Sequence, residues 1–516
     1  MVTGTGEGRV PPPRRPIDRW IPILLATGVF VLHMLLSTRY GYFRDELYYI
    51  AASRHPALGY FDFPAGVAMV AWLVGHTVGY RLWALHVPPA LAHAALILIA
   101  GGIAADAGAG TFGILLASLA VAVSPAYLGS GSILTMDVFD QLCWALAGWA
   151  ALRALQQDRP RAWLWFGAAA AVGLFFKMTM LLFGGAVLAG LLLTEVGRRH
   201  LRTVWPWVGG CIAALGVLPY FVWEVVHGWP TLAFYAHYRA ARASGGAGPA
   251  KFVLGQLLLS SWLSAPIWLA GLWYALVVSA GRRVRAVGIA YVFLLVLLAA
   301  FRAKIYFLAP MYTLLFGLGG PRLEAWSRRR AWPRVAYTAV VTLAAAAMAP
   351  LVMPLLPPAS AAAYAAPLHV GAHSPTASTP LIQPLADRFG WPQQVATIAR
   401  VYRGLPAAER TVACVVTGNY GEASAVNFFG PAEGLPPAIS GHNQYYLWGP
   451  RGCTFQEVVS IGLPATFLTK LFTSVRPAAT VHCEYCMPEE NDLSVYVDRG
   501  PRQSPGTTWT LLRSVS

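Results

Sequence analysis

The sequence predicts a polytopic α-helical membrane protein with a small C-terminal α/β domain. Of its 516 residues, 57% are hydrophobic and only 12% are charged, whereas soluble domains carry about a quarter charged residues. The mean hydropathy is +0.53. The apolar residues gather in long runs, which a lipid bilayer accommodates and water does not. These runs stop near residue 356, where a more polar composition begins.

Apolar runs of spanning length recur through the first two thirds of the chain, separated by short polar breaks. We expect about eleven transmembrane helices, at residues 17–37, 82–105, 112–127, 137–155, 162–176, 178–194, 204–224, 253–279, 285–301, 305–320 and 333–356. We therefore assign residues 1–356 to a transmembrane domain.

The basic residues indicate how these spans are oriented, because Lys and Arg favour the cytoplasmic side of a membrane. Four arginines precede the first span, namely Arg9, Arg14, Arg15 and Arg19. With the N-terminus in the cytoplasm, 18 Lys and Arg residues fall on that side and ten on the other. An odd number of spans then places the C-terminal domain outside the cell membrane.

The net charge of +16 does not indicate a nucleic-acid-binding protein. Residues 1–356 carry 28 Lys and Arg against 12 Asp and Glu, a difference of +16, and residues 357–516 carry ten of each. The whole excess therefore lies among the spans, where it serves topology and contact with anionic membrane lipids. We expect no nucleic-acid partner.

Three segments outside the spans define the rest of the organisation. Residues 38–81 form a long outward loop with short surface helices, and loops of this size are uncommon unless functional. Residues 357–384 are rich in Pro, Ala and Ser and read as a linker. Residues 385–516 form a soluble domain with strand-like runs at 411–417 and 493–497 and a helical stretch at 393–403.

Four cysteines, Cys414, Cys453, Cys483 and Cys486, fall in this C-terminal domain. The spacing of the last two, together with the other pair, fits either a zinc site or two disulfides. We favour two disulfides, because the predicted topology places the domain in an oxidising compartment. The sequence does not give the pairing.

The charged triplet Arg44-Asp45-Glu46 is the leading candidate for chemistry. It follows the first span and opens a short surface helix on the outward side, where acidic residues are few. One interpretation is helix capping, since Asp at the cap and Glu in the first turn are both common. The other makes Asp45 the catalytic base for an acceptor hydroxyl or amine, with Glu46 assisting and Arg44 contacting the substrate.

Further candidates for substrate binding lie near the outward ends of other spans. They are Asp62, Asp137, Lys177, Lys304 and Tyr306. Charges at a membrane edge are costly and therefore mark functional sites. Outward lysines run against the positive-inside rule, and a lipid phosphate would explain them. The alternative is that the lysines anchor helices at the headgroup level.

Sequence motifs for other chemistries are missing. The histidines show no metal-ligand spacing, and there is neither a phosphate-binding Gly-rich loop nor a serine-nucleophile motif. Carboxylates at the site could hold a divalent cation, but nothing in the sequence indicates a metal, and we expect no cofactor.

The segments named so far resemble the glycosyltransferase C fold, and in particular the superfamily of protein O-mannosyltransferases that also contains the bacterial aminoarabinose transferase. The closest resemblance is to bacterial members whose acceptors are unassigned. The matching segments are YFRDELYY at 42–49, GYFDFP at 59–64, MDVFD at 136–140, KIYFLAP at 304–310, NYGEA at 419–423, SGHN at 440–443 and WGP at 448–450.

This resemblance implies an inverting transferase that takes a sugar from a polyprenyl-phosphate-linked donor and passes it to an unknown acceptor on the extracytoplasmic face. Asp45 would be the base, and outward basic residues would hold the lipid phosphate. Relatives often carry a double proline after the loop aspartate, whereas this chain has Asp62-Phe-Pro-Ala65. That departure leaves the role of Asp62 open.

Two other functions remain as alternatives. A transporter or flippase for a lipid-linked or polar solute would also need many spans, but the sequence shows no pair of broken helices in matching halves. A membrane receptor or scaffold would act through its C-terminal domain. The charged outward loop fits a surface enzyme better than either.

Overall fold

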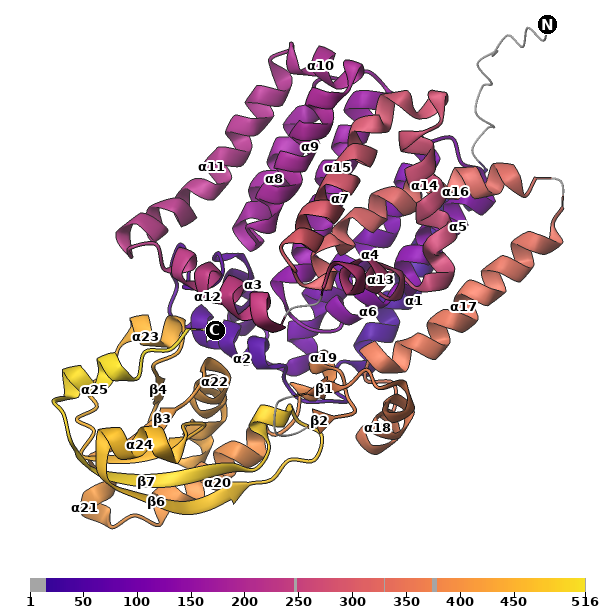
Figure 1. The fold of residues 1–516 in the computed structure, drawn as a ribbon. Coiled ribbons are helices and arrows are strands. Elements are labelled where there is room, and N and C mark those ends of the chain that lie inside the picture. The colour runs from indigo at the N-terminus through magenta and orange to yellow at the C-terminus, as the bar shows by residue number, and fades with distance from the viewer. Residues whose placement is uncertain (1–14, 246–247, 329, 374–377, 516) are drawn as a thin grey trace, which may run out of the picture.

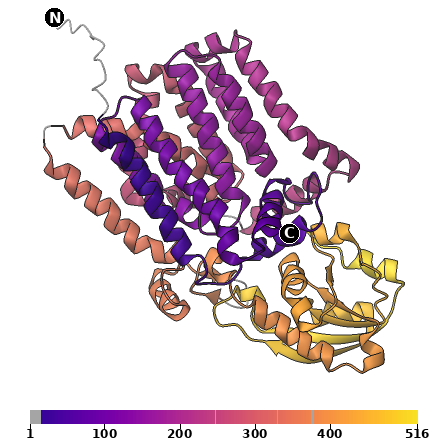
Figure 2. The same ribbon diagram turned by 180° about the vertical axis from the view of Figure 1, so that it is seen from behind.

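The structure is a computed structural model that describes residues 15–245, 248–328, 330–373 and 378–515. Long helices form a bundle, and a sheet built by the C-terminal part lies against one end of it (Figure 1, Figure 2). Arg9 and Arg14, which support the predicted orientation, lie outside the described residues.

The part of the chain up to residue 352 is helical. Its α-helices are α1 (Ile17–Leu36), α2 (Arg44–Ser53), α3 (Gly66–Thr77), α4 (Leu82–Asp106), α5 (Thr111–Val123), α6 (Pro125–Ser130), α7 (Met136–Gln156), α8 (Ala162–Phe176), α9 (Thr179–Leu193), α10 (Glu195–Leu201), α11 (Trp205–Val226), α12 (Pro230–Gly245), α13 (Pro249–Leu259), α14 (Ala265–Leu276), α15 (Arg285–Ala300), α16 (Tyr312–Trp326) and α17 (Trp332–Val352). Its 3₁₀ helices are η1 (Trp262–Ser264), η2 (Ser279–Val284) and η3 (Ile305–Met311).

Each predicted span contains a helix. Within the described residues, five helices are long and apolar enough to cross a membrane, or up to seven if each of two bent pairs is one span. The pairs are α9 with α10, bent by 111°, and α13 with residues 262–276, bent by 83°. The helices support a polytopic membrane protein, while the count of eleven spans stays a prediction.

Two predicted spans are not continuous helices. The span predicted at 253–279 is broken at Ser261, whose φ of +61° lies in the left-handed region that an α-helix cannot contain. The span predicted at 112–127 is broken at Ser124, because the following Pro125 pushes Ser124 into an extended conformation. Apolar composition predicted both runs but not these breaks.

Small residues let neighbouring helices approach closely. A Cβ added to Gly319 of α16 would lie 1.7 Å from the carbonyl oxygen of Ile267, and one added to Gly271 of α14 would lie 2.2 Å from that of Leu315. The backbones of α14 and α16 are therefore in direct contact, as is usual where helices associate by packing rather than by the hydrophobic effect.

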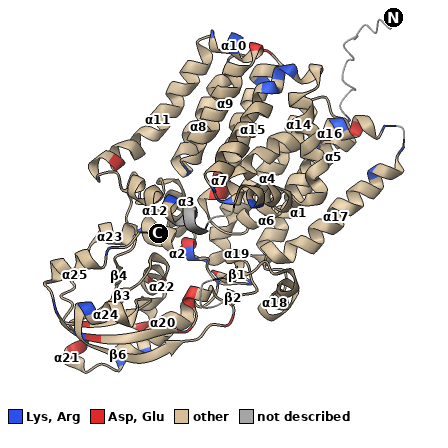
Figure 3. Cartoon of the chain, viewed as in Figure 1, with Lys and Arg blue, Asp and Glu red and all other residues tan. Residues whose placement is uncertain are grey.

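Two arginines mark one end of the bundle. The short helix α10, which carries Arg198 and Arg199, lies at the end farthest from the C-terminal sheet (Figure 3). The predicted topology requires this arrangement, with the arginine-rich loops and the C-terminal sheet on opposite sides of the membrane.

The remaining residues form the C-terminal part. Its helices are α18 (Pro358–Ala365), η4 (Ala366–Leu368), α19 (Gln383–Ala386), α20 (Trp391–Arg403), α21 (Ala407–Arg410), α22 (Tyr420–Phe429), η5 (Gly430–Glu433), α23 (Gln444–Trp448), α24 (Ala465–Leu471), η6 (Pro488–Glu490) and α25 (Pro505–Leu511). Its strands are β1 (Ala372–His373), β2 (Ser378–Thr379), β3 (Ala413–Thr417), β4 (Ala438–Ser440), β5 (Glu457–Ile461), β6 (Phe472–Val481) and β7 (Leu493–Pro501).

Five of these strands form one mixed sheet in the order β4-β3-β5-β7-β6. β3 runs parallel to β4 and β5, so that Val415 lies opposite both Ala438 and Val459, and β7 runs antiparallel to β5 and β6. The predicted strands at 411–417 and 493–497 and the predicted helix at 393–403 are confirmed as β3, β7 and α20.

The range predicted as a linker carries structure in its described residues, and 374–377 lie outside them. It contains α18, and β1 pairs with β2 in an antiparallel ladder. Ala361 and Leu381 pack with Tyr40, which follows α1. The segment therefore ties the C-terminal part to the start of the loop at 38–81.

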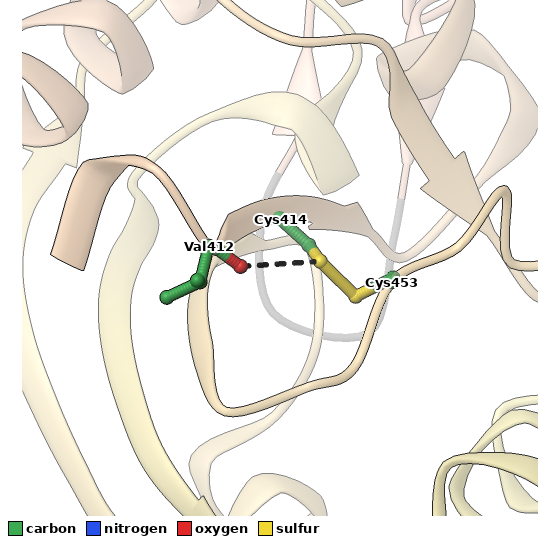
Figure 4. Close-up of a disulfide and its surroundings, with 3 residues drawn as sticks. All are labelled: Val412, Cys414 and Cys453. Atoms are coloured by element: carbon green, nitrogen blue, oxygen red, sulfur yellow. Dashed lines mark hydrogen bonds between the residues drawn. A yellow bond between two sulfur atoms is a disulfide. The ribbon is translucent and has the colours of Figure 1, made fainter. Parts of the chain in front are cut away.

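The cysteines form one disulfide, not two. Cys414 on β3 is bonded to Cys453 (Figure 4), which closes a separation of 39 residues. The carbonyl oxygen of Val412 lies 3.9 Å from the Cys414 sulfur. Cys483 and Cys486 are free, and the Cys486 thiol donates a hydrogen bond of 3.1 Å to the carbonyl oxygen of Cys483. The prediction of a second disulfide is therefore wrong.

Candidate functional site

The helix α2 begins where its sequence predicts it. Phe43 is extended, with φ −72° and ψ 147°, and Glu46 accepts a hydrogen bond of 2.9 Å from the Phe43 N–H. Acidic residues in the first turn also stabilise the positive end of the helix dipole. The start of α2 at Arg44 then turns Asp45, Tyr48 and Tyr49 into a common cavity.

This cavity, which we call the site cavity, has a volume of about 190 Å³. It lies between α2, the α8–α9 corner, α12, η3 and the start of α22. Five predicted site residues line it, namely Asp45, Asp62, Lys177, Lys304 and Tyr306. Tyrosines fill much of the remaining wall, including Tyr48, Tyr49, Tyr220, Tyr235, Tyr238 and Tyr420.

Asp45 is placed to accept a proton. Its Oδ1 accepts a hydrogen bond of 2.7 Å from the Tyr420 hydroxyl. Burial raises the pKa of the Asp45 carboxyl, although the Tyr420 hydrogen bond and the charges of Arg44 and Lys304 act in the opposite direction. A carboxylate with a raised pKa is a stronger base than an exposed one.

Asp62 is the second carboxylate of the site cavity. Its two oxygens accept hydrogen bonds from the Tyr48 hydroxyl at 3.0 Å and from the Asn443 amide at 3.3 Å. Burial raises the pKa of Asp62 to about 7, and the negative charge of Asp45 acts in the same direction. The two carboxyl groups therefore affect each other's ionisation across the cavity.

Lys177 and Asp137 form an ion pair beside the site cavity. α8 ends at Phe176, Lys177 is extended, and α9 begins two residues later, so the lysine lies in the break between two helices. The Lys177 ammonium also lies 4.5 Å from the ring centre of Phe307. Asp137 thus reaches the cavity through Lys177 and is not part of its lining.

Lys304 and Tyr306 lie at the start of η3. The Lys304 ammonium is 5.9 Å from the ring centre of Tyr306 and 5.8 Å from that of Tyr238 on α12. The positive charge of Lys304 acts to lower the pKa of the Asp45 carboxyl. Two cations therefore face the two carboxylates of the same cavity.

Glu46 does not line the site cavity. Its side chain is 0% exposed. Its Oε1 accepts hydrogen bonds from the Leu134 N–H at 2.8 Å and from His86 at 2.9 Å, besides the bond of Oε2 with Phe43. Burial alone would raise the pKa of Glu46, but His86 and the two N–H groups lower it, so this carboxylate is held ionised.

Arg44 also lies outside the lining of the site cavity. It forms ion pairs with Asp387 at 2.8 Å, with Glu489 at 3.3 Å and with Glu490 at 3.4 Å. All three partners belong to the C-terminal part. Protein carboxylates therefore surround the Arg44 guanidinium, whereas the sequence suggested that Arg44 contacts the substrate.

The C-terminal part supplies two site residues that the sequence reasoning did not select. Tyr420 follows β3, and Asn443 follows β4, a parallel neighbour in the sheet. Because parallel strands end at the same edge of a sheet, the two residues lie on the same side: Tyr420 lines the site cavity, and Asn443 contacts its Asp62. Both residues lie in segments that carry the family resemblance, 419–423 and 440–443, but the resemblance assigned no role to either of them.

The donor set offers little for a metal ion. Among the described residues, no group of three or more His, Cys, Asp or Glu side chains is arranged to hold one. The carboxylates of the site cavity are instead matched by lysines and tyrosine hydroxyls.

Comparison with known proteins finds a family that matches part of the chain. Residues 62–223 match the family described as dolichyl-phosphate-mannose-protein mannosyltransferase. No curated protein matches the sequence.

Solved structures show the same fold. The crystal structure of ArnT from Cupriavidus metallidurans bound to undecaprenyl phosphate is 16% identical and has a TM-score of 0.59, covering 93% of this chain and 98% of that one. The apo state of the same protein gives 16% identity, a TM-score of 0.61 and coverage of 94% and 98%. The chain therefore has the glycosyltransferase C fold of these solved structures, and its residues 62–223 match the mannosyltransferase family.

Proposed function

We propose that this protein is a glycosyltransferase, which transfers a sugar, with inversion, from a polyprenyl-phosphate-linked donor to an acceptor hydroxyl or amine in the site cavity. The observation that carries the proposal is the meeting of Asp45 with Lys177 and Lys304 in one cavity. A lipid phosphate needs cations, and an acceptor needs a base. The solved ArnT relative holds undecaprenyl phosphate, which is a donor carrier of the proposed chemistry.

The proposed reaction is a single displacement. Asp45 takes the proton of the acceptor O–H or N–H while the acceptor atom forms a bond to the anomeric carbon. The bond between that carbon and the phosphate oxygen breaks, and the phosphate keeps the electron pair. Lys304 and Lys177 stabilise the charge that grows on the leaving phosphate, so this group needs no proton.

The other site residues have supporting roles in this proposal. Tyr420 orients the Asp45 carboxylate through its hydrogen bond, and Asp137 holds Lys177. Asp62 lines the same cavity and would contact the sugar there. Glu46 is a positioning residue, because its carboxylate is fully used in anchoring α2.

We place the reaction on the extracytoplasmic face of an integral membrane protein whose N-terminus is cytoplasmic. The arginines of α10 lie at the end of the bundle opposite the C-terminal sheet, in support of this orientation. The acceptor is a protein, a lipid or an envelope glycan.

Asp45→Asn should abolish transfer. The amide cannot take a proton, so single-turnover transfer from a polyprenyl-phosphate sugar in detergent should fall by about 10²–10⁴. The matched control is Asp492→Asn, since Asp492 lies outside the site cavity and pairs with His482. Unchanged transfer by Asp45→Asn would refute the assignment of Asp45 as the catalytic base.

Lys304→Ala should weaken use of the donor. Loss of a charged hydrogen bond to phosphate, at about 1.5–3 kcal/mol, should lower kcat/KM for the donor by about 10- to 150-fold. Lys251→Ala on α13 is the control, because Lys251 does not line the site cavity. Equal donor kinetics in the two variants would refute a role in phosphate binding.

The pH dependence of sugar transfer should reflect the ionisation of the Asp45 carboxyl group. Only ionised Asp45 accepts a proton, so activity is lost as pH falls through its pKa. Burial raises that pKa, which places the acid limb above the range of ordinary carboxyl groups. Tyr420→Phe removes a hydrogen bond that lowers the pKa, so the limb of the kcat profile should move to higher pH. A limb that stays in place would contradict the contact.

Glu46→Ala should act on stability. It leaves three buried donors unpaired, and we expect a loss of about 3–5 kcal/mol, seen as a lower melting temperature in detergent. Asp45→Ala is the control, because Asp45 carries a single hydrogen bond to another side chain among the described contacts. If Glu46→Ala melts like the wild type and loses only activity, Glu46 is part of the chemistry and not of the anchor.

A further inference from the structure

Helix α2 separates two cavities. Asp45, Tyr48 and Tyr49 line the site cavity on one face, whereas Ile50 and Arg54 line a second cavity on the opposite face. This second cavity, which we call the rear cavity, has a volume of about 380 Å³ and lies between α2 and the C-terminal part. It is therefore larger than the site cavity and takes no part in the proposed reaction.

The rear cavity combines an apolar floor with a cationic rim. Leu47, Val426 and Leu435 belong to the floor, and Arg54 and Arg451 belong to the rim. Among the described residues that line it, none is acidic. A cavity of this kind attracts a molecule with an anionic group and an apolar body.

Both rim arginines are held in place by neutral groups. The Arg54 guanidinium donates a hydrogen bond of 3.1 Å to the carbonyl oxygen of Asn427. The Arg451 guanidinium lies 3.2 Å from Nε2 of His55, whose Nδ1 lies 3.0 Å from the carbonyl oxygen of Ala51. Since the carbonyl takes the Nδ1 proton, Nε2 accepts from Arg451. A guanidinium group has five N–H donors, and each of these contacts uses one of them.

The backbone at Arg451 is strained in the position that brings this side chain to the rim. Its φ is +48°, in the left-handed region, between Gly449 and Gly452, which have φ of +79° each. A non-glycine residue stays in this region only where its surroundings hold it, and such positions gather at binding sites. The neighbouring Trp448 stacks on His55 with ring centres 4.5 Å apart, which holds the rim against α2.

We propose that the rear cavity is an accessory binding site for an anionic amphiphile. Its phosphate or carboxylate would bind between Arg54 and Arg451, as guanidinium groups bind such anions in bidentate fashion. Its apolar chain would cover the floor, which a free phosphate ion would leave in contact with water. The bound molecule would be separated from Asp45 by α2, a helix with a diameter of about 10 Å, and is thus neither donor nor acceptor.

The test uses the full-length protein in a neutral detergent and a photoreactive probe, decyl phosphate that carries a diazirine in its chain. Mass spectrometry of the labelled peptides should find the probe in residues 47–54 and 424–437. Arg54→Gln with Arg451→Gln should reduce this labelling at least about tenfold. Arg476→Gln, an exposed arginine on β6, is the matched control, and Lys304→Ala should leave the labelling unchanged.

A second variant guards against misfolding. Arg451→Gly removes the guanidinium and relieves the left-handed backbone, so the protein should keep its melting temperature. Labelling of the rear cavity should still fall in this variant. Labelling that survives in both the double variant and Arg451→Gly would overturn the proposal.

Competition with the probe tests whether binding needs both the anionic group and the apolar chain. Octyl phosphate should displace the probe, whereas octyl glucoside and inorganic phosphate at the same concentration should not. Equal displacement by octyl glucoside would mean that the arginines do not select an anion. Equal displacement by inorganic phosphate would mean that the apolar floor adds nothing. Either result would overturn the proposal, and neither depends on sugar transfer.

Discussion

One buried carboxylate fixes the helix on which the site is built. Glu46 satisfies the N–H groups of Phe43 and Leu134 and pairs with His86, so it joins α2 to α4 and to the segment before α7. A buried charge is tolerated only when it is fully paired, and this requirement sets the position of α2. The neighbouring Asp45 is then directed into the site cavity, because successive residues on a helix point in different directions.

The site cavity is also a junction between two parts of the chain. The helical part supplies Asp45, Lys177 and Lys304, and the C-terminal part supplies Tyr420 and Asn443. Arg44 holds the two parts together through Asp387 and Glu490, which follow it by 343 and 446 residues in sequence. The helical part brings the cations and carboxylates of the site, and the C-terminal part adds neutral hydrogen-bond donors to those carboxylates.

The sequence predicted the apolar helices well, because a helix that crosses a bilayer needs a long run of apolar residues, and such runs are visible in the composition. It also predicted which charges lie near the site, since Asp45, Lys177 and Lys304 are unusual for their place in a membrane protein. It did not predict the roles of Arg44 and Glu46, whose partners are distant in sequence. Nor did it predict the break at Ser261 or the free pair of cysteines, which depend on backbone geometry that composition does not encode.

The hydrogen bond between Tyr420 and Asp45 forms late in the synthesis of the chain. Ribosomes release the membrane helices first, and those helices already carry Asp45 and both lysines. The carboxylate receives its orienting hydroxyl only after β3 has formed and Tyr420 has reached α2. A half-made chain in the membrane therefore holds these charged groups without the Tyr420 contact, so that in the proposed mechanism the site is complete only once the C-terminal part has folded.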